Sequence, residues 1–176
     1  MRKLTHEELI DRQKNQDSFK PAFSAVLNNI RSLYNVGALF RTADGAGLEK
    51  LWLCGITGIP PDPMISKTAL GAEKAVPWEY RRRAAEVLRE LKAKGTQIVF
   101  LEQTAESIPV EDFKPSGPVC LVVGNEIEGV SDELLKYCDA AVEIEMSGLK
   151  NSLNVTVAFG IAAYYFRNAL KVDSTK

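Results

Sequence analysis

Polar side chains interrupt an apolar segment near the beginning of this chain. An apolar run at residues 23–27 leads into a second apolar stretch, yet Asn28, Arg31, Asn35 and Arg41 stand within it. A polar or charged group at a core-like position costs free energy unless it is hydrogen-bonded or put to use. Two arginines and two asparagines in this setting predict a site that handles an anionic group.

Two further polar segments, residues 124–130 and 145–152, each follow a short apolar run. Such runs are typical of central strands in a parallel sheet, and parallel sheets bind ligands outside the carboxyl ends of their strands. We therefore expect both segments to lie on one rim of a sheet, beside residues 28–35 and 102–106. Gly124 directly follows its run, where the lack of a Cβ allows the backbone to approach a neighbour closely.

The order of apolar runs and helical patterns predicts the elements that position these loops. Predicted strands lie near residues 22–28, 51–54, 97–101, 119–123 and 140–144, and predicted helices near 6–16, 35–46, 66–72, 84–94, 131–137 and 153–170. Thr5 and Glu8 have the spacing of a capping box. Alternating strands and helices indicate an α/β fold with a mostly parallel sheet. We expect one domain at 21–170, a short helical extension at 1–20 and a flexible tail at 171–176.

Composition limits the class of protein. The chain has 176 residues, of which 45% are hydrophobic and 26% charged, as in an ordinary soluble domain. No apolar run approaches the roughly 20 residues of a membrane helix, and the first residues lack the apolar core of a signal peptide. Cys54, Cys120 and Cys138 are interpreted as buried thiols, not as a disulfide frame or a metal site. We therefore expect a cytoplasmic protein that does not contact a membrane.

The net charge of −1 conceals an uneven distribution. Basic residues are in excess over residues 1–100 and acidic residues over 101–176, so the first part could present a local basic face. The densest basic run, residues 81–83, is most simply interpreted as the solvated face of a helix.

The sequence argues against two common kinds of site. It has no glycine-rich loop that ends in Gly-Lys-Ser/Thr, and residues 45–47 (Gly-Ala-Gly) are expected to follow a helix and not a strand, which argues against a nucleotide-binding oxidoreductase. His6 is the only histidine, which argues against histidine triads and histidine-rich metal sites. A general base would have to be a carboxylate, lysine, arginine, tyrosine, water or a substrate phosphate.

Taken together, the polar segments resemble the SpoU (TrmH) branch of the SPOUT superfamily of RNA 2′-O-ribose methyltransferases. The matching motifs, within residues 22–168, are Asn28-x-x-Arg31 with Asn35-x-Gly37-x-x-x-Arg41-Thr42-Ala43, Gly124-Asn125-Glu126-x-x-Gly129-Val130, and Ile144-x-Met146-x-Gly148 with Ser152-Leu153-Asn154-Val155-x-Val157-Ala158. The resemblance implies a parallel sheet flanked by helices, with a deep trefoil knot in the C-terminal part. It also implies an obligate homodimer whose active sites use residues of both subunits. The last apolar helix, with Phe159, Tyr164, Tyr165 and Phe166, would serve that interface or the core.

The same resemblance implies S-adenosylmethionine (SAM) as the methyl donor, S-adenosylhomocysteine as the product and no requirement for a metal. The residues that would bind SAM, largely through backbone groups, are Leu101, Glu102, Leu121, Gly124, Ile144, Met146, Ser152 and Leu153. Glu145 stands where the family usually has proline, which adds a charge and flexibility beside this loop.

Catalytic and RNA-binding roles also follow from the resemblance. The catalytic residues would be Asn35, Arg41, Glu126, Ser152 and Asn154, and the RNA-binding residues Asn28, Arg31 and Arg41. Arg41 resembles the family's catalytic arginine, but arginine is a poor base because it keeps its proton at almost any pH. We expect Arg41 to hold the adjacent phosphate and to lower the pKa of the 2′-OH electrostatically. A phosphate or water would accept the proton, with Glu126 as an alternative base.

Each of these residues also has a purely structural interpretation. Asn35 and Asn154 could form hydrogen bonds at helix ends. Arg31 could form a structural ion pair, and Arg41 could pair with Asp44 or Glu126.

The substrate is expected to be tRNA in preference to rRNA, because the chain lacks the separate N-terminal RNA-binding domain of many rRNA-modifying relatives. Its net charge also offers little non-specific attraction to phosphate. Two alternatives stay open: the same chemistry on rRNA, and a SPOUT-like dimer that binds RNA or SAM without catalysis.

Overall fold

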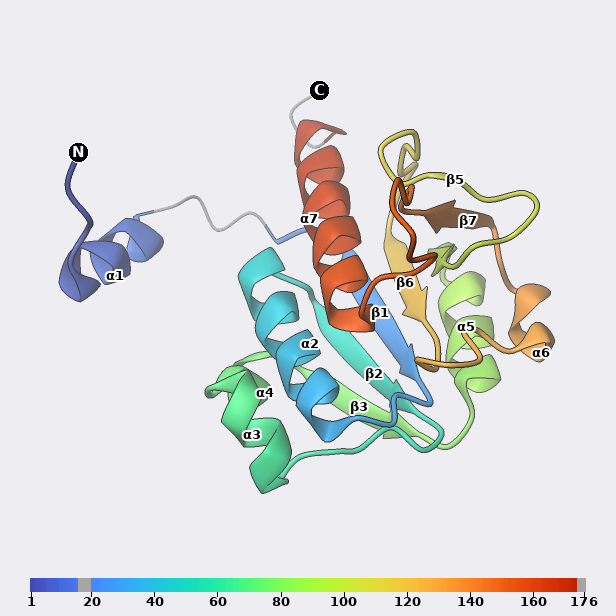
Figure 1. Ribbon diagram of the computed structural model, residues 1–176, viewed down its shortest axis with the longest axis horizontal. Coiled ribbons are helices and arrows are strands. Elements are labelled where there is room, and N and C mark those ends of the chain that lie inside the picture. Colours follow the sequence, from blue (N-terminus) through green and yellow to red (C-terminus); the bar gives the residue numbers. More distant parts are fainter. Residues whose placement is uncertain (16–19, 174–176) are drawn as a thin grey trace.

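A seven-stranded parallel sheet lies at the centre of the fold (Figure 1). The computed structural model describes residues 1–15 and 20–173. The strands are β1 (Phe23–Asn28), β2 (Lys50–Cys54), β3 (Trp78–Arg81), β4 (Gln97–Leu101), β5 (Ile108–Pro109), β6 (Val119–Val123) and β7 (Ala140–Glu143), and their order across the sheet is β3-β2-β1-β6-β4-β7-β5. Because all pairings between these strands are parallel, their carboxyl ends collect along one edge of the sheet.

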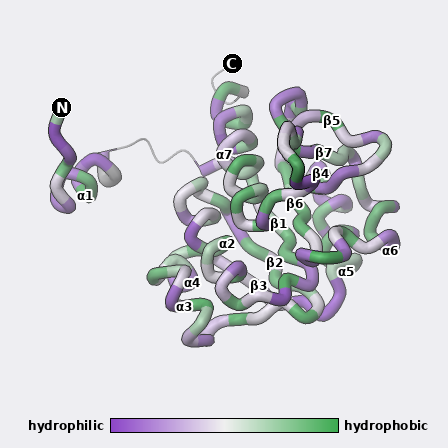
Figure 2. The backbone as a smooth tube through the Cα atoms, in the orientation of Figure 1, coloured by the Kyte–Doolittle hydropathy of each residue, from purple (hydrophilic) through white to green (hydrophobic). Residues whose placement is uncertain are grey.

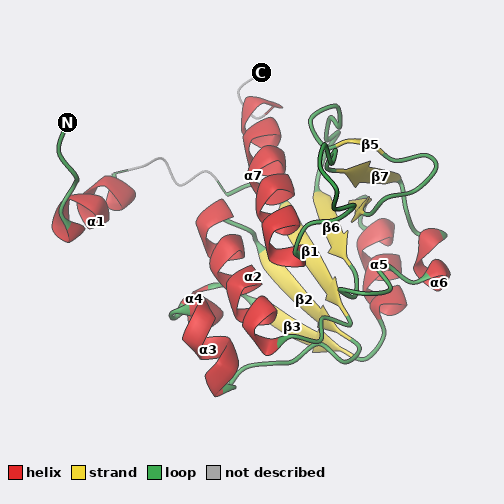
Figure 3. Ribbon diagram, viewed as in Figure 1, coloured by secondary structure: helices red, strands yellow, loops and turns green. Residues whose placement is uncertain are grey.

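Helices cover both faces of this sheet (Figure 3). They are α1 (His6–Lys14), α2 (Leu33–Ala46), α3 (Pro63–Ala69), α4 (Ala72–Ala75), α5 (Ala84–Ala93), α6 (Asp132–Leu135) and α7 (Val155–Asp173). Residues of α2, α3, α4 and α7 pack into one hydrophobic cluster, and those of α5 and α6 into a second cluster on the opposite face. Within residues 1–15 and 20–173, no helix is both long enough and apolar enough to cross a membrane.

The two clusters explain why the central strands are apolar throughout. All residues of β1 and β6 are buried. Successive side chains of a strand point to opposite faces, so Ala25 and Leu27 join the cluster beneath α2 and α7, whereas Val26 joins the cluster beneath α5. Figure 2 shows these strands as hydrophobic segments inside a more polar periphery. A strand that is covered on both faces needs a continuous apolar run, not an alternating one.

The predicted fold class and all five predicted strands are confirmed. The capping box is also present, because the Glu8 N–H donates to Thr5 Oγ1 at 3.3 Å and the Thr5 N–H donates to Glu8 Oε2 at 2.8 Å. The predicted end of this first helix, residue 16, lies outside the described residues.

Five local predictions were wrong. The strands β3 and β5 were not expected. Residues 81–83 are not the face of a helix, because Arg81 ends β3 and the next two arginines precede α5. The helix expected at 66–72 is two helices, because Asp62 caps α3 early and Leu70 adopts a left-handed backbone with φ of 52° after it. Similarly, α2 begins two residues early because Ser32 caps it. Finally, α6 spans only part of the expected range.

The position of β7 shapes the rim of the sheet. It lies between β4 and β5, which are consecutive strands in the chain and are joined by residues 102–107. When the chain leaves the end of β7, it therefore stands between β4 and β5, the two strands that residues 102–107 join. It then runs through residues 144–154 to α7, which packs against α2 on the face with Leu27 and Leu121.

Candidate active site

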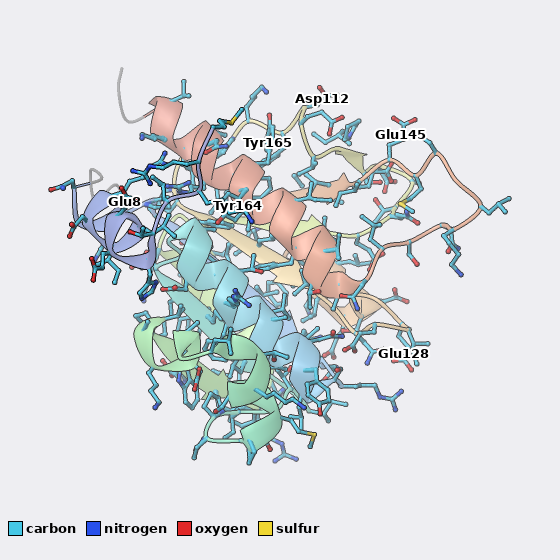
Figure 4. All side chains as sticks on the ribbon, turned by 60° about the vertical axis from the view of Figure 1, so that its left-hand side comes forward. Glu8, Asp112, Glu128, Glu145, Tyr164 and Tyr165 are labelled. Carbon is cyan, nitrogen blue, oxygen red and sulfur yellow. The ribbon has the colours of Figure 1, made fainter. Side chains whose placement is uncertain are left out.

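A cavity of about 590 Å³ opens at the carboxyl rim of the sheet. It is lined by Leu101, Glu102, Gln103, Val123, Gly124, Asn125, Glu126, Ile127, Gly129, Glu143, Ile144, Met146, Asn151, Ser152, Leu153, Asn154, Val155 and Ala158. These residues come from the ends of β4, β6 and β7, the loops that follow them, and the start of α7. Figure 4 shows Glu128 and Glu145 on two of these loops, where both side chains point away from the ribbon.

The loop after β6 is tightly folded. Asn125 and Gly129 exchange two backbone hydrogen bonds of 2.9 Å. Asn125 Oδ1 also accepts hydrogen bonds from the N–H groups of Ile127 and Glu128, at 2.8 and 3.1 Å. Gly124 is buried against this turn, and a Cβ there would lie 2.2 Å from the carbonyl of Gly129. The sequence therefore needs glycine at residue 124 to bring the loop close to the end of its strand.

Glu102 joins two walls of the cavity. Its Oε2 accepts a hydrogen bond from the Val130 N–H at 3.0 Å, and its Oε1 accepts one from the Gln103 N–H at 2.9 Å. Gln103 in turn donates from Nε2 to the carbonyl of Asn151 at 2.8 Å. The loops after β4, β6 and β7 are thereby tied to one another around the cavity.

Glu126 holds the first turn of α2 against the cavity. Its carboxylate accepts hydrogen bonds from the N–H groups of Arg31 (3.0 Å) and Ser32 (3.2 Å) and from Asn35 Nδ2 (3.0 Å). Burial alone would raise the pKa of Glu126, but these hydrogen bonds outweigh it and place the pKa below the ordinary value of a glutamate. A carboxylate with a lowered pKa is a weaker base, so this geometry favours a positioning role for Glu126 over a role as general base.

Asn154 caps the last helix. Its Oδ1 accepts hydrogen bonds from the Thr156 N–H at 2.8 Å and from Thr156 Oγ1 at 2.6 Å. The expected helix-end hydrogen bond of Asn154 is thus present, and the residue also lines the cavity with its neighbour Ser152. Asn35 shows both features as well, since its N–H donates to the capping Ser32 Oγ while its amide contacts Glu126.

Arg41 lies outside this cavity. It lines a second, shallower hollow of about 510 Å³ between α2, α3 and α7. Arg41 is six residues after Asn35 on α2, a separation of about 9 Å along a helix axis. In the part of the chain that the structure describes, neither Arg31 nor Arg41 forms a salt bridge, so the expected alternative of a structural ion pair is not seen for either residue.

Most of the predicted site residues meet in one place. The predicted residues that line the cavity are Leu101, Glu102, Gly124, Glu126, Ile144, Met146, Ser152, Leu153 and Asn154. Leu121 does not line it, because the residue is fully buried within β6. Asn28 is only 5% exposed at the end of β1, so its predicted contact with RNA has no support in this structure.

Four polar residues of the cavity were not among the predicted site residues: Gln103, Asn125, Glu143 and Asn151. Glu143 accepts a hydrogen bond from Ser107 Oγ at 2.6 Å, which ties β7 to the connection between β4 and β5. Asn125 stood in a recognised motif, but nothing in the sequence showed that its side chain would organise the loop. Gln103 could have been suspected only from its place two residues after the end of β4.

The lining suits an organic ligand that carries both a flat apolar part and positive charge. Leu101, Ile144, Met146 and Leu153 supply apolar surface, and the strand ends supply backbone polar groups. The carboxylates of Glu102, Glu126 and Glu143 give the cavity a negative character. Its volume is within the range of small-molecule sites. Among the described residues there is no group of three or more His, Cys, Asp and Glu side chains that could hold a metal ion.

The chain is similar in sequence to known proteins. Residues 22–164 match the family described as the SpoU rRNA Methylase family. The chain is 34% identical over 145 residues to a 23S rRNA (guanosine-2′-O-)-methyltransferase, RlmB, of Ralstonia nicotianae, an alignment that covers 82% of this chain and 57% of that protein. The chain thus spans little more than half the length of this curated relative.

Solved structures show the same architecture. The crystal structure of the TrmH/SpoU tRNA modifying enzyme of A. aeolicus has a TM-score of 0.81 at 29% identity, with 94% of this chain and 86% of that one covered. A second crystal structure, of an AdoMet-bound rRNA methyltransferase from Sinorhizobium meliloti, has a TM-score of 0.79 at 28% identity, with 88% and 59% covered.

Proposed function

This chain belongs to the SpoU rRNA Methylase family, and we propose that it transfers a methyl group from SAM to a ribose 2′-OH of RNA. The observation that carries the proposal is the rim cavity, which is lined by nine residues that the family resemblance implies for SAM binding or catalysis. A relative named as a 2′-O-methyltransferase and a structural neighbour described as AdoMet-bound support it.

We propose that the rim cavity is the SAM site. Leu101, Ile144, Met146 and Leu153 would contact the adenine ring, and backbone groups from Gly124 and from the 144–154 loop would fix it. The carboxylates of the cavity would attract the positively charged parts of the donor. SAM supplies an electrophilic methyl group bound to a cationic sulfur. The Glu102–Gln103–Asn151 hydrogen bonds would hold the three loops in place around it.

The protein's own contribution to the reaction would be positioning and electrostatics. Arg41 would bind a phosphate next to the reacting ribose and lower the pKa of the 2′-OH, while it keeps its own proton. The hydroxyl proton would pass to a substrate phosphate or to water, because the lowered pKa of Glu126 makes that carboxylate a poor acceptor. Asn35, Ser152 and Asn154 would fix the ribose and the loop next to the methyl group.

A homodimer would bring Arg41 to a cavity. Arg41 does not line the cavity of its own subunit. The helix α7, whose residues Val155 and Ala158 line that cavity, exposes Val157 and Ile161 one turn apart. We propose that two copies pair through this face and that Arg41 of one acts at the cavity of the other. Phe159 and Phe166 take no part in such an interface, because both are fully buried in the core.

Mixing experiments test the shared site. Arg41→Ala and Ser152→Ala homodimers should each be inactive. Every mixed dimer contains one intact combination and one doubly inactive site, so an equal mixture that has exchanged subunits at random should regain about a quarter of the wild-type activity per site. Failure to regain activity in a mixture that has exchanged subunits would contradict a site built from two subunits.

We also propose that the chain is knotted at the rim. The supporting observation is the place of β7 between β4 and β5, with residues 102–107 joining those strands and residues 144–154 leading out between them. An electron-density trace in which residues 144–154 pass outside the 102–118 segment would contradict the knot.

The RNA substrate is proposed to be tRNA, with rRNA as the alternative, and the related proteins include enzymes named for each. Incubation with methyl-labelled SAM and separated total tRNA and rRNA tests this choice. Label on tRNA at one alkali-resistant linkage would support the proposal, and label on rRNA alone would overturn the substrate. Binding of SAM without any label would favour a non-catalytic RNA- or SAM-binding dimer. A cytoplasmic location and a reaction without a metal remain predictions.

A further inference from the structure

The three consecutive arginines at residues 81–83 stand at the carboxyl rim of the sheet. Arg81 ends β3, and the next two arginines lead into α5. Asn28 is paired with Cys54, and Cys54 with Arg81, so β1, β2 and β3 end at one level. Figure 1 shows the arrowheads of these three strands at one edge of the sheet. Arg82 and Arg83 therefore leave the sheet at the same rim as the cavity.

Arg82 and Arg83 differ from Arg81 in their partners. Arg81 forms salt bridges with Glu79 at 2.6 Å and with Glu90 at 3.8 Å. Arg82 and Arg83 are exposed, and neither forms a salt bridge within residues 1–15 and 20–173. Glu79 is also bound by Lys50, at 2.8 Å. Two adjacent guanidinium groups without a protein carboxylate attract an anion from outside, and their planar donors suit phosphate.

Hydrogen bonds connect this part of the rim to the cavity. Asn29, just after β1, has a left-handed backbone with φ of 60°, which asparagine tolerates better than most residues. Its carbonyl accepts a hydrogen bond from Asn125 Nδ2 at 3.0 Å, and its Oδ1 accepts one from the Ile56 N–H at 3.1 Å. The next loop is tied on in turn, because the Gly55 N–H donates to the Arg81 carbonyl at 3.3 Å. The arginines are thus held in a fixed place relative to the cavity.

The distance along the rim fits the nucleotides next to the reacting one. The strands β6 and β3 are three strand spacings of about 4.8 Å apart, so the arginine run begins about 14 Å from the strand whose loop lines the cavity. Arg31 follows β1 and lies between them. The carboxylates in the cavity repel phosphate, so an RNA strand that reaches the cavity needs cations farther along its path.

This part of the rim is separate from the proposed contact between two copies. The helix α5, which Arg83 precedes, packs on the face of the sheet opposite α2 and α7. A second copy seated on Val157 and Ile161 of α7 would cover the other face, and Arg82 and Arg83 would stay exposed.

We propose that Arg82 and Arg83 bind the phosphates of nucleotides that flank the methylated one, so that the RNA strand runs along the rim from the cavity past Arg31 to the end of β3. The proposal rests on the proposed function, and it assigns RNA contacts to two residues outside the three family motifs. Both arginines would set how tightly the RNA is held without touching the methyl donor.

Replacement of both arginines tests the phosphate contacts. The log of the affinity for a single strand changes by about 0.7 per phosphate contact for each tenfold change in salt. Arg82→Ala/Arg83→Ala should therefore reduce the salt slope by about 1.4 and weaken binding about 25-fold at 0.1 M salt. The probes are total bacterial tRNA and 23S rRNA, each titrated against the full chain over a series of salt concentrations. The KM for the methylated RNA should rise, and the affinity for SAM should stay unchanged.

Two controls separate a local contact from a general effect of charge. Lys94→Ala removes one cation from the other end of α5, where the side chain is exposed, and it should bind RNA like the wild type. Its charge-matched counterpart, Arg82→Ala alone, should bind about fivefold more weakly. Arg82→Lys/Arg83→Lys keeps both charges and should stay within about threefold of the wild-type affinity.

Three results would overturn the proposal. These are an unchanged affinity and salt slope in Arg82→Ala/Arg83→Ala, an equal loss in Lys94→Ala and Arg82→Ala, and a loss in the double lysine variant as large as in the double alanine variant. Failure of the proposed function is separable. A wild-type protein that binds RNA through these arginines but never methylates it would refute methyl transfer and leave this surface standing.

Discussion

Replacing Glu126 by glutamine removes one charge from the first turn of α2 and keeps the shape of the side chain. The carboxylate accepts three hydrogen bonds, two of them from backbone N–H groups of Arg31 and Ser32. A hydrogen bond to a charged acceptor contributes about 1.5–3 kcal/mol, against about 0.5–1.5 kcal/mol for a neutral one. Glutamine offers one acceptor oxygen instead of two, and the residue is exposed to solvent, which weakens each interaction. We therefore expect Glu126→Gln to lower the free energy of unfolding by about 1–2 kcal/mol at pH 7.

The dependence of this difference on pH gives the sharper test. The pKa of Glu126 is lower in the folded protein than in the unfolded chain. Its contribution is therefore fully present above the unfolded value of about 4.3, and it is lost as the pH falls through the folded value. Urea unfolding of both proteins should show a constant difference between pH 6 and 8 and a shrinking difference below about pH 4.

Glu128→Gln is the matched control, because Glu128 is two residues away on the same loop and its side chain is exposed. It should leave the free energy of unfolding within about 0.5 kcal/mol of the wild type. A positioning role for Glu126 also predicts that Glu126→Gln keeps the wild-type pH profile of methyl transfer and loses less than about tenfold in kcat. A loss of a hundredfold or more with a changed pH profile would show that Glu126 is the base. An equal stability of the two proteins from pH 3.5 to 8 would refute the account of the hydrogen bonds.

Three further predictions concern the frame of the site. Gly124→Ala should destabilise the protein by about 3 kcal/mol, because its Cβ would meet the Gly129 carbonyl. Gly148→Ala is the control, because a Cβ at Gly148 meets no atom within 4 Å and should change the free energy of unfolding very little. Urea unfolding compares the two variants, and an unchanged stability of Gly124→Ala would disprove the close approach. Asn154→Ala should lower the free energy of unfolding by about 1 kcal/mol because it removes the cap of α7, whereas Asn154→Asp should retain the cap. Thermal unfolding compares the two variants, and an unchanged stability of Asn154→Ala would show that the cap is dispensable. Burial raises the pKa of Cys54 and Cys120 to about 12, so mass spectrometry after alkylation at pH 8 should find both unmodified until the protein is unfolded; rapid alkylation of either in the native state would contradict their burial.

The extent to which sequence predicted this protein differs between its parts. The central strands were predictable because burial on both faces demands uninterrupted apolar runs, as in β6. The strand β3 was not, because it lies at the edge of the sheet and its residues Trp78–Arg81 are only partly buried, which leaves a mixed polar pattern. The two residues of β5 are too short to give any pattern.

The sequence predicted most of the residues that line the candidate site, but not what each of them contacts. The motifs placed Glu126 near Asn35, since both belong to loops at one rim. The sequence could not show that Glu126 folds back onto the backbone of Arg31 and Ser32, because more than 90 residues separate these partners and only the register of β1 against β6 brings them together. It likewise could not show that Arg41 faces a different hollow, because that depends on where α3 and α7 pack against α2.

The strand order has a consequence for synthesis of the protein on the ribosome. The first three strands made, β1, β2 and β3, are adjacent in the sheet, so they can pair early. The other edge of β1 stays open until residues 119–123 emerge as β6. During that interval a fully apolar strand presents unpaired backbone groups, which is the kind of edge at which nascent chains aggregate. A nascent chain halted before β6 would therefore depend on chaperones, and a message truncated there would yield insoluble product.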